Sequence, residues 1–105
     1  MTKQQQIEIE AAAFRGLIKH LQIRTDVQNI DLMNLSGFCR NCLSKWYLAE
    51  AKNQGLEIDY PTAQLAVYGM SIDDWKEKHQ TPASEEQKQE FEKTKPLHAK
   101  ISGHN

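Results

Sequence analysis

Residues 2–23 have the sequence TKQQQIEIEAAAFRGLIKHLQI, in which apolar side chains recur at intervals of three and four. That spacing is typical of an α-helix with apolar faces. Thr2 and Gln5 are spaced as in a capping box, so we expect the helix to begin near Thr2 and to end near Ile23. The apolar residues form two stripes, a large-residue stripe and a small-residue stripe. The first consists of Ile7, Ala11, Phe14, Leu17, Ile18 and Leu21, and the second of Ile9, Ala12, Ala13, Gly16 and Ile23.

Two apolar stripes on one helix have two explanations. Either the domain covers both stripes, or the small-residue stripe contacts a second copy of the chain, since closed symmetric dimers are the commonest oligomers. Both explanations are open at the level of sequence, and we carry the homodimer forward as a prediction. Leu48, which stands alone on the polar side of its predicted helix, is expected to add to that contact.

The rest of the chain repeats the helical spacing, with caps, glycines and prolines between the segments. We predict further helices at about residues 26–35, 38–53, 60–68, 71–79 and 83–94. Strand-like alternation occurs only in residues 56–60, a stretch too short and isolated to form a stable sheet. The predicted fold class is therefore all-α, a compact irregular array of five to six short helices with no significant sheet. We expect a core of Phe14, Ile18, Leu21, Phe38, Leu43, Trp46, Leu65, Val67 and Trp75.

Length and composition limit the number of domains and the possible classes of function. The chain has 105 residues, 39% of them hydrophobic and 26% charged, which predicts one globular domain. We assign that domain to residues 1–95 and expect residues 96–105 to form a C-terminal tail packed on it. The net charge of −1 argues against nucleic-acid binding, because such proteins carry a basic excess. No apolar run long enough to cross a membrane and no signal peptide is present, so we expect a cytoplasmic protein.

Cys39 and Cys42 are the residues most suggestive of chemistry. The two residues are three positions apart on one predicted helix, so their thiols lie on the same face. That spacing allows them to bind one metal ion or to exchange a disulfide. Cys39 falls at the predicted helix start, where the helix dipole and the neighbouring Arg40 favour a thiolate. The same two residues also lie among Phe38, Leu43, Trp46 and Ala49 on an apolar face, where cysteine serves as a small packing residue.

Histidines supply the further ligands that a metal site needs. His79 shares a helix face with Ile72 and Trp75 and is predicted to point inward, which makes it a candidate third ligand. His98 on the tail is a candidate fourth ligand, followed by His104, and zinc is the metal that this ligand set suits. The alternative for His79 is a core histidine near a helix C-terminus, where the dipole favours its charged form.

Residues 37–43, GFCRNCL, followed by Lys45-Trp46-Tyr47, resemble a family of short bacterial proteins catalogued as domain of unknown function number 1244. Tyr68-Gly69-Met70, Trp75 and His79-Gln80 resemble its second block, and Pro96-Leu97-His98-Ala99 its C-terminal block. The resemblance spans nearly the whole chain. It implies a compact helical array in a bacterial cytosol and assigns no reaction, ligand or partner.

We therefore expect a non-catalytic binding module centred on the helix of Cys39 and Cys42, which binds a metal, a protein partner or both. The first alternative is a dithiol oxidoreductase that uses the same two cysteines. Helical dithiol enzymes of the alkylhydroperoxidase type carry a histidine just downstream of the pair, where this chain has Lys45 and Trp46. The second alternative is a structural homodimer whose cysteines only pack. Whether the chain is an enzyme, and what substrate or partner it has, stays open.

Overall fold

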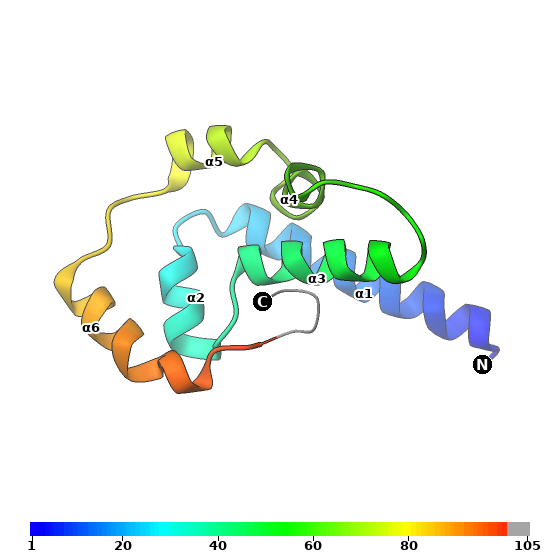
Figure 1. The fold of residues 1–105 in the computed structure, drawn as a ribbon, viewed down its shortest axis with the longest axis horizontal. Helices are drawn as coiled ribbons and strands as arrows, with labels where there is room; N and C mark the ends of the chain where they lie inside the picture. The colour runs from blue at the N-terminus through cyan, green and yellow to red at the C-terminus, as the bar shows by residue number, and fades with distance from the viewer. Residues whose placement is uncertain (101–105) are drawn as a thin grey trace.

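The computed structural model describes residues 1–100, and over that range it contains six α-helices, one short 3-10 helix and no strand. In chain order the elements are α1 (Lys3–Ile23), α2 (Asn29–Ser36), α3 (Arg40–Asn53), α4 (Tyr60–Tyr68), α5 (Ile72–His79), α6 (Glu85–Thr94) and η1 (Lys95–Leu97). The predicted all-α class, with five to six short helices and no significant sheet, is confirmed (Figure 1).

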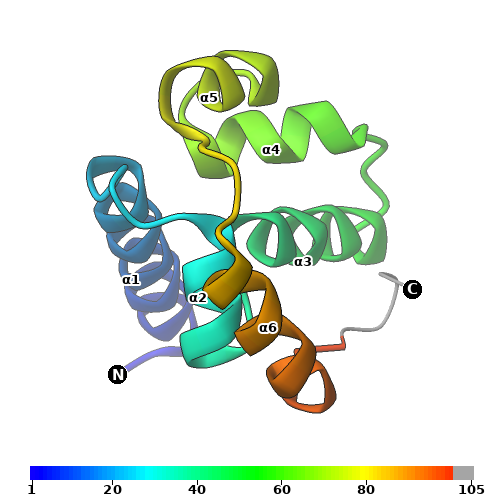
Figure 2. The same cartoon turned by 90° about the vertical axis from the view of Figure 1, so that its left-hand side faces the viewer.

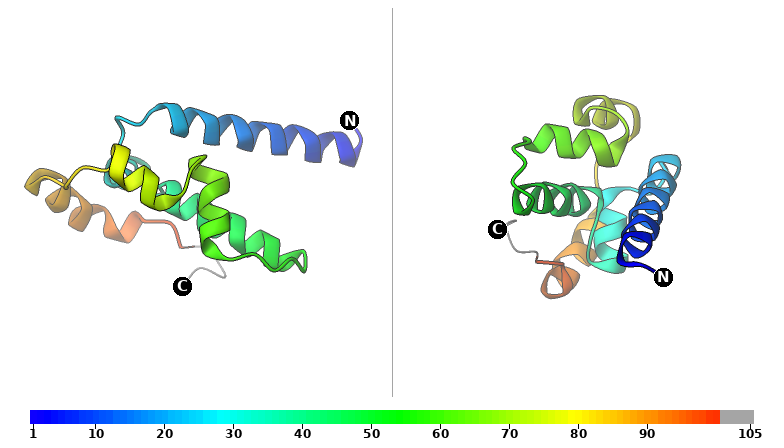
Figure 3. Two further views of the ribbon diagram at one scale, coloured as in Figure 1. Left: turned by 90° about the horizontal axis from the view of Figure 1, so that it is seen from above. Right: turned by 90° about the vertical axis from the view of Figure 1, so that its right-hand side faces the viewer.

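The helices form a small irregular array around α3. Helix α4 lies across α3, and α5 continues the same layer (Figure 2). Helices α2 and α6 pack side by side at one end of the molecule. Helix α1 runs along one side of the array and contacts α4 (Figure 3). This arrangement brings residues from α2, α3 and α5 together at one point, where the site described below is found.

Local capping explains most of the helix boundaries. The Thr2 side chain accepts the Gln5 amide hydrogen while the Gln5 side chain accepts that of Thr2, which confirms the predicted capping box. The last helix begins at Glu85 rather than at the predicted residue 83. The reason is a capping box between Ser84 and Gln87, which the sequence interpretation did not predict.

Two helices end at glycines in the left-handed region, which other residues rarely adopt. Helix α4 ends at Gly69, with φ of 75°, and α2 ends at Gly37, with φ of 82°. The carbonyl of Gly37 also accepts a 2.8 Å hydrogen bond from the amide of Ala99. Residues near the start of the predicted tail thus lie against the turn that leads into α3.

The core is formed by α1, α3, α4 and α5. Its buried members are Ile18, Leu21, Leu43, Val67, Tyr68 and Trp75, with Phe14, Leu32, Phe38, Trp46, Met70 and Ile72 partly buried against them. One predicted core residue is wrong, because Leu65 is 52% exposed. Helix α4 buries the side that carries Ala63 and Val67, and Leu65 lies on the opposite side.

Helix α1 projects beyond the rest of the molecule at its N-terminal end (Figures 1 and 3). All residues from Lys3 to Glu10 are exposed. The radius of gyration is 15.0 Å, larger than the roughly 13 Å expected of a compact chain of this length. Within the described residues no helix combines the length and the apolar character that crossing a membrane requires.

Candidate functional site

Cys39 and Cys42 lie at the start of α3 and are both buried free thiols. Cys39 is the residue that precedes the first turn, and Cys42 lies within that turn. The Cys42 sulfur is 3.9 Å from the sulfur of Met33 on α2. The structure thus brings the two predicted cysteines together, and it places them in the packing between α3 and its neighbours.

The expectation of a favoured thiolate at Cys39 is wrong. Burial raises the pKa of the Cys39 thiol, and this effect outweighs the backbone amides of Cys42 and Asn41, which lower it. The guanidinium of Arg40 does not offset the loss of water, because it is bound to backbone carbonyls elsewhere in the core. A buried thiol with a raised pKa is a poor nucleophile.

The two candidate histidine ligands lie in separate aromatic contacts. The His79 ring packs on Trp75, with centroids 4.7 Å apart. The His98 ring packs on Phe91 at the same 4.7 Å, and its Nε2 atom lies 2.8 Å from the hydroxyl oxygen of Thr94. Across residues 1–100 there is no group of three or more His, Cys, Asp or Glu side chains arranged to hold a metal. His104 lies outside the described residues.

Arg40 is the residue whose role the sequence interpretation missed. Its side chain is 1% exposed and is one of the largest fully buried side chains of the described chain. Its Nε and one terminal nitrogen donate to the carbonyl of Leu21, at 3.2 and 2.8 Å, and that nitrogen also donates to the carbonyl of Arg24, at 2.9 Å. The other terminal nitrogen donates to the carbonyl of Val27, at 2.8 Å, and to Oδ1 of Asn29, at 3.0 Å. All five donors of the guanidinium are therefore used, and together they close the C-terminal end of α1.

A directional chain of hydrogen bonds starts at this guanidinium. Arg40 donates to Oδ1 of Asn29, and Nδ2 of Asn29 donates to the hydroxyl of Tyr68 at 2.9 Å. The Tyr68 hydroxyl donates in turn to Oδ1 of Asn41 at 2.7 Å. Each hydrogen bond fixes which atom of the next side chain donates and which accepts. The chain therefore ends at the amide nitrogen of Asn41, whose hydrogens have no partner within the chain of bonds. Burial raises the pKa of Tyr68 well above its ordinary value, which keeps its proton in place.

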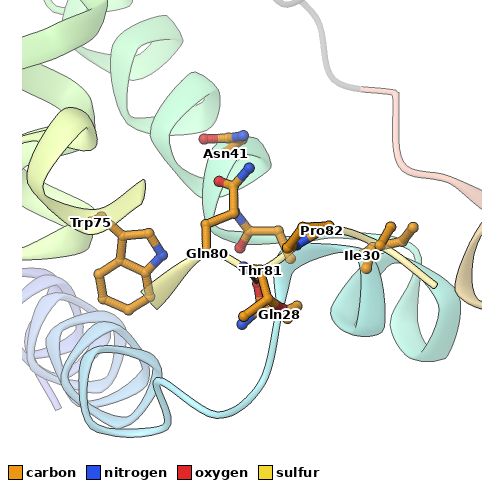
Figure 4. A pocket seen from close by; sticks show the side chains of 9 residues that line it. Gln28, Ile30, Asn41, Trp75, Gln80, Thr81 and Pro82 are labelled. Carbon is orange, nitrogen blue, oxygen red and sulfur yellow. Dashed lines mark hydrogen bonds between the residues drawn. The ribbon is translucent and has the colours of Figure 1, made fainter. Parts of the chain in front are cut away.

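The chain ends at a pocket of about 280 Å³ between α2, α3, α5 and the segment that joins α5 to α6 (Figure 4). We call it the amide pocket. It is lined by Gln28, Asn29, Ile30, Asn41, Trp75, Gln80, Thr81, Pro82 and Ala83.

One wall of the amide pocket is held by Gln28. Its side chain donates to the carbonyl of His79 at 2.9 Å and accepts from the amide of Thr81 at 3.0 Å. The segment after α5 is thereby tied to the start of α2. Hydrogen bonds between elements thus hold the shape of the pocket. Four of its nine lining residues carry side-chain amides.

The sequence contained one signal for this site. Arg40 stands between two cysteines on a predominantly apolar helix face, and a buried arginine needs several acceptors. Its partners could not be inferred, because the carbonyls that it meets belong to a loop and a helix end that only the fold brings near. Asn41 and Tyr68 are 27 residues apart and meet only through the packing of α4 on α3.

Residues 27–93 match the model of a family described as "Protein of unknown function (DUF1244)". The match covers well over half of the chain and includes every residue that lines the amide pocket. Helix α1 and the segment after α6 lie outside it. No curated protein matches the chain.

Proposed function

We propose that this chain, which belongs to the DUF1244 family, is a non-catalytic binding module that works as a homodimer through α1. The cysteines and Arg40 then serve to hold the fold. The observation that carries the proposal is an apolar side of α1 that none of the described residues covers. We call this side the free face and define it as Ile9, Ala12, Ala13, Gly16 and Ile23.

The free face is apolar and open along its whole length. Ile9 is 55% exposed and Ile23 is 68% exposed, and the three small residues between them are exposed as well. A Cβ atom placed on Gly16 would meet no atom within 4 Å. Small side chains in the middle of an open apolar strip permit a second helix to approach closely, as at other tight helix contacts.

Charges on α1 favour a second copy in antiparallel orientation. Glu8 and Glu10 lie in the N-terminal half of the helix, and Arg15 and Lys19 lie in the C-terminal half. On a helical wheel Glu8 and Lys19 flank the free face on the same side. A two-fold axis near the middle of Ala12–Gly16 therefore sets Glu8 of each copy beside Lys19 of the other. Parallel pairing would leave Glu8 and Lys19 at different levels along the contact, too far apart to pair.

The exposed N-terminal turns of α1 agree with this proposal. The eight helical residues from Lys3 to Glu10 are all exposed, and helical turns that bury no apolar face are marginal in water. A second copy supplies that packing. Leu48, which we expected to join the contact, is partly buried within its own chain.

The metal and redox alternatives have weaker support. Zinc ligation by Cys39, Cys42, His79 and His98 would require both histidines beside the cysteines, whereas each histidine packs on an aromatic ring of its own and no metal-holding group of three such side chains occurs within residues 1–100. Dithiol exchange would require an accessible, acidic thiol, whereas both thiols are buried and the pKa of Cys39 is raised. Two free thiols suit a reducing compartment, and we infer the bacterial cytosol that the family resemblance implies.

Sedimentation equilibrium with a charge-swap cycle tests the homodimer. We expect the wild-type chain to dimerise at micromolar concentration, and Glu8→Lys and Lys19→Glu each to weaken the dimer several-fold because like charges then face each other. The double variant restores opposite charges and should recover most of the affinity. A wild-type monomer at these concentrations contradicts the proposal, as does a double variant weaker than either single one.

A further inference from the structure

We infer that the amide pocket binds a small aliphatic carboxylate. This inference is independent of the homodimer, because the pocket and the free face share no residue. It rests on two unused hydrogen-bond donors, one buried positive charge, the absence of acidic residues from the lining and the size of the pocket.

Trp75 supplies the first donor. Its side chain is 3% exposed, its indole N–H makes no hydrogen bond within residues 1–100, and its nitrogen is not among the fully buried unpaired atoms of that range, so the N–H is open to the pocket. Figure 4 shows the indole nitrogen on the edge of the ring that faces Gln80, Thr81 and Gln28, toward the pocket. The ring itself is fixed by Tyr68, whose centroid is 5.1 Å away in an edge-on arrangement, and by the neighbouring His79. A donor held rigidly at the wall of the pocket is placed to bond an acceptor that enters it.

Asn41 supplies the second donor. Its Oδ1 atom accepts the proton of Tyr68, so its Nδ2 group is left without a partner among the described residues. The hydrogen-bond chain through Asn29 and Tyr68 prevents the amide from turning over. Since each bond in such a chain polarises the next, the Nδ2 hydrogens carry added positive character that originates at Arg40.

The electrostatics of the pocket favour one negative charge. The Arg40 guanidinium lies 4.8 Å from the centroid of the Trp75 ring, and it bonds only to carbonyl oxygens and to Asn29. Asp26, the nearest acid in sequence to these acceptors, pairs with Arg24 at 2.9 Å. No aspartate or glutamate lines the pocket. A buried cation without a carboxylate partner attracts an anion that enters nearby.

The lining narrows the class of anion. The donors that face the pocket are neutral and the one cation lies behind the Trp75 ring, which suits the single charge of a carboxylate better than the double charge of a phosphate monoester. Ile30, Pro82 and Ala83 form an apolar wall for an aliphatic chain. A volume of about 280 Å³ is at the lower limit of ligand pockets, so the chain must be short.

The indole N–H resonances of the two tryptophans give a direct test. In ¹H–¹⁵N spectra of the full chain, sodium butyrate at constant ionic strength should shift the Trp75 resonance with a saturable, low-millimolar dependence. Trp46 is the internal control, because it lines a separate groove and its indole N–H, although unpaired within the described residues, is buried away from solvent, so its resonance should stay in place. Trp46→Phe assigns the two resonances.

Three further samples decide whether the pocket recognises the charge. Butyramide, which has the shape of butyrate without its charge, should bind at least about tenfold more weakly, a loss of about 1.4 kcal/mol. Asn41→Asp keeps the acceptor for Tyr68 and adds a negative charge to the pocket, so it should abolish the shift. Tyr68→Phe frees the Asn41 amide and should weaken binding several-fold. Equal binding of butyramide, unchanged binding by Asn41→Asp, or a linear shift of both indoles would overturn the inference.

Discussion

Arg40 is a buried cation without a carboxylate partner, and its five hydrogen bonds explain how the chain tolerates it. Three backbone carbonyls and one amide oxygen surround the guanidinium. These carbonyls belong to the end of α1 and to the loop that follows, where helical partners are lacking. Burial lowers the pKa of Arg40 from its ordinary value, and the positive charge is retained because arginine begins so far above neutral pH. One side chain thus ties α1, α2 and α3 together.

Replacement of Arg40 by lysine should destabilise the protein strongly. Lysine keeps the charge, but its donors radiate from one atom and cannot reach acceptors on three sides, which leaves buried carbonyls unsatisfied. We expect the free energy of unfolding to fall by about 3 kcal/mol in urea titrations. Arg24→Lys is the matched control, because its ion pair with Asp26 is exposed, and it should change stability little. Near-equal effects of the two substitutions would disprove the role assigned to Arg40.

Stability should decline at alkaline pH because the folded chain holds protons that the unfolded chain releases. Burial raises the pKa of Cys39, Tyr60 and Tyr68, so their contribution is complete below their ordinary pKa values and is lost as pH rises above them. The unfolded state then binds fewer protons, and the free energy of unfolding falls from about pH 9 upward. Urea titrations between neutral pH and pH 10.5 should show this fall. Tyr68→Phe should make this fall smaller without removing it, because the raised pKa values of Cys39 and Tyr60 still contribute.

The sequence pattern correctly placed Cys39 and Cys42 on an apolar, buried face, but the thiolate predicted at Cys39 took no account of burial. Position at a helix start is a local property and predicts a favoured thiolate at Cys39. Loss of water around the sulfur depends on α2 and α4, which no local pattern reveals, and it is the larger effect. For the same reason the polar residues Arg40, Asn41 and Tyr68 escaped notice. Their chemistry depends on partners far away in the chain.

Gly37 couples the end of α2 to the C-terminal segment, so its replacement should cost more than a left-handed glycine normally does. A Cβ on Gly37 would lie 2.5 Å from the backbone oxygen of Leu97, whereas one on Gly55 would meet nothing within 4 Å. The two glycines have similar φ angles, 82° and 77°, so Gly55→Ala isolates the cost of the backbone conformation. We expect about 1–2 kcal/mol for Gly55→Ala and a clearly larger loss for Gly37→Ala, measured by urea unfolding. Equal losses would mean that the contact with Leu97 relaxes without cost.

Helix boundaries were predictable wherever a short-range signal sets them. Thr2 with Gln5, Pro61 with Gly69, and Ser71 each mark a helix end within one residue of the observed one. Leu65 is an example of what such short-range signals do not predict, namely which side of a helix is buried. Helix α4 is apolar nearly all round, and the positions of α1, α3 and α5, which all contact it, determine which side is buried.

The whole molecule consists of an array from α2 to α6 and a long helix that extends past it. The residues that match the DUF1244 model begin after α1, yet Ile18 and Leu21 from the second half of α1 belong to the core. The first half contributes none of the core residues. The second half of α1 therefore packs one side on the core and carries part of the free face on another, whereas the first half serves only the proposed contact with a second copy.

Removal of residues 1–10 should separate these roles. The remaining part of α1 keeps Phe14, Ile18 and Leu21, which pack on the core, and loses only exposed residues. At concentrations low enough to keep the full chain monomeric, the shortened chain should match its free energy of unfolding within about 1 kcal/mol, because exposed turns stabilise a domain little. The homodimer should be lost, since Ile9 and Glu8 are removed from both copies at once. Circular dichroism follows the fold and sedimentation equilibrium follows the assembly. A shortened chain that still dimerises would place the contact elsewhere, and one that fails to fold would show that the first half of α1 supports its own domain.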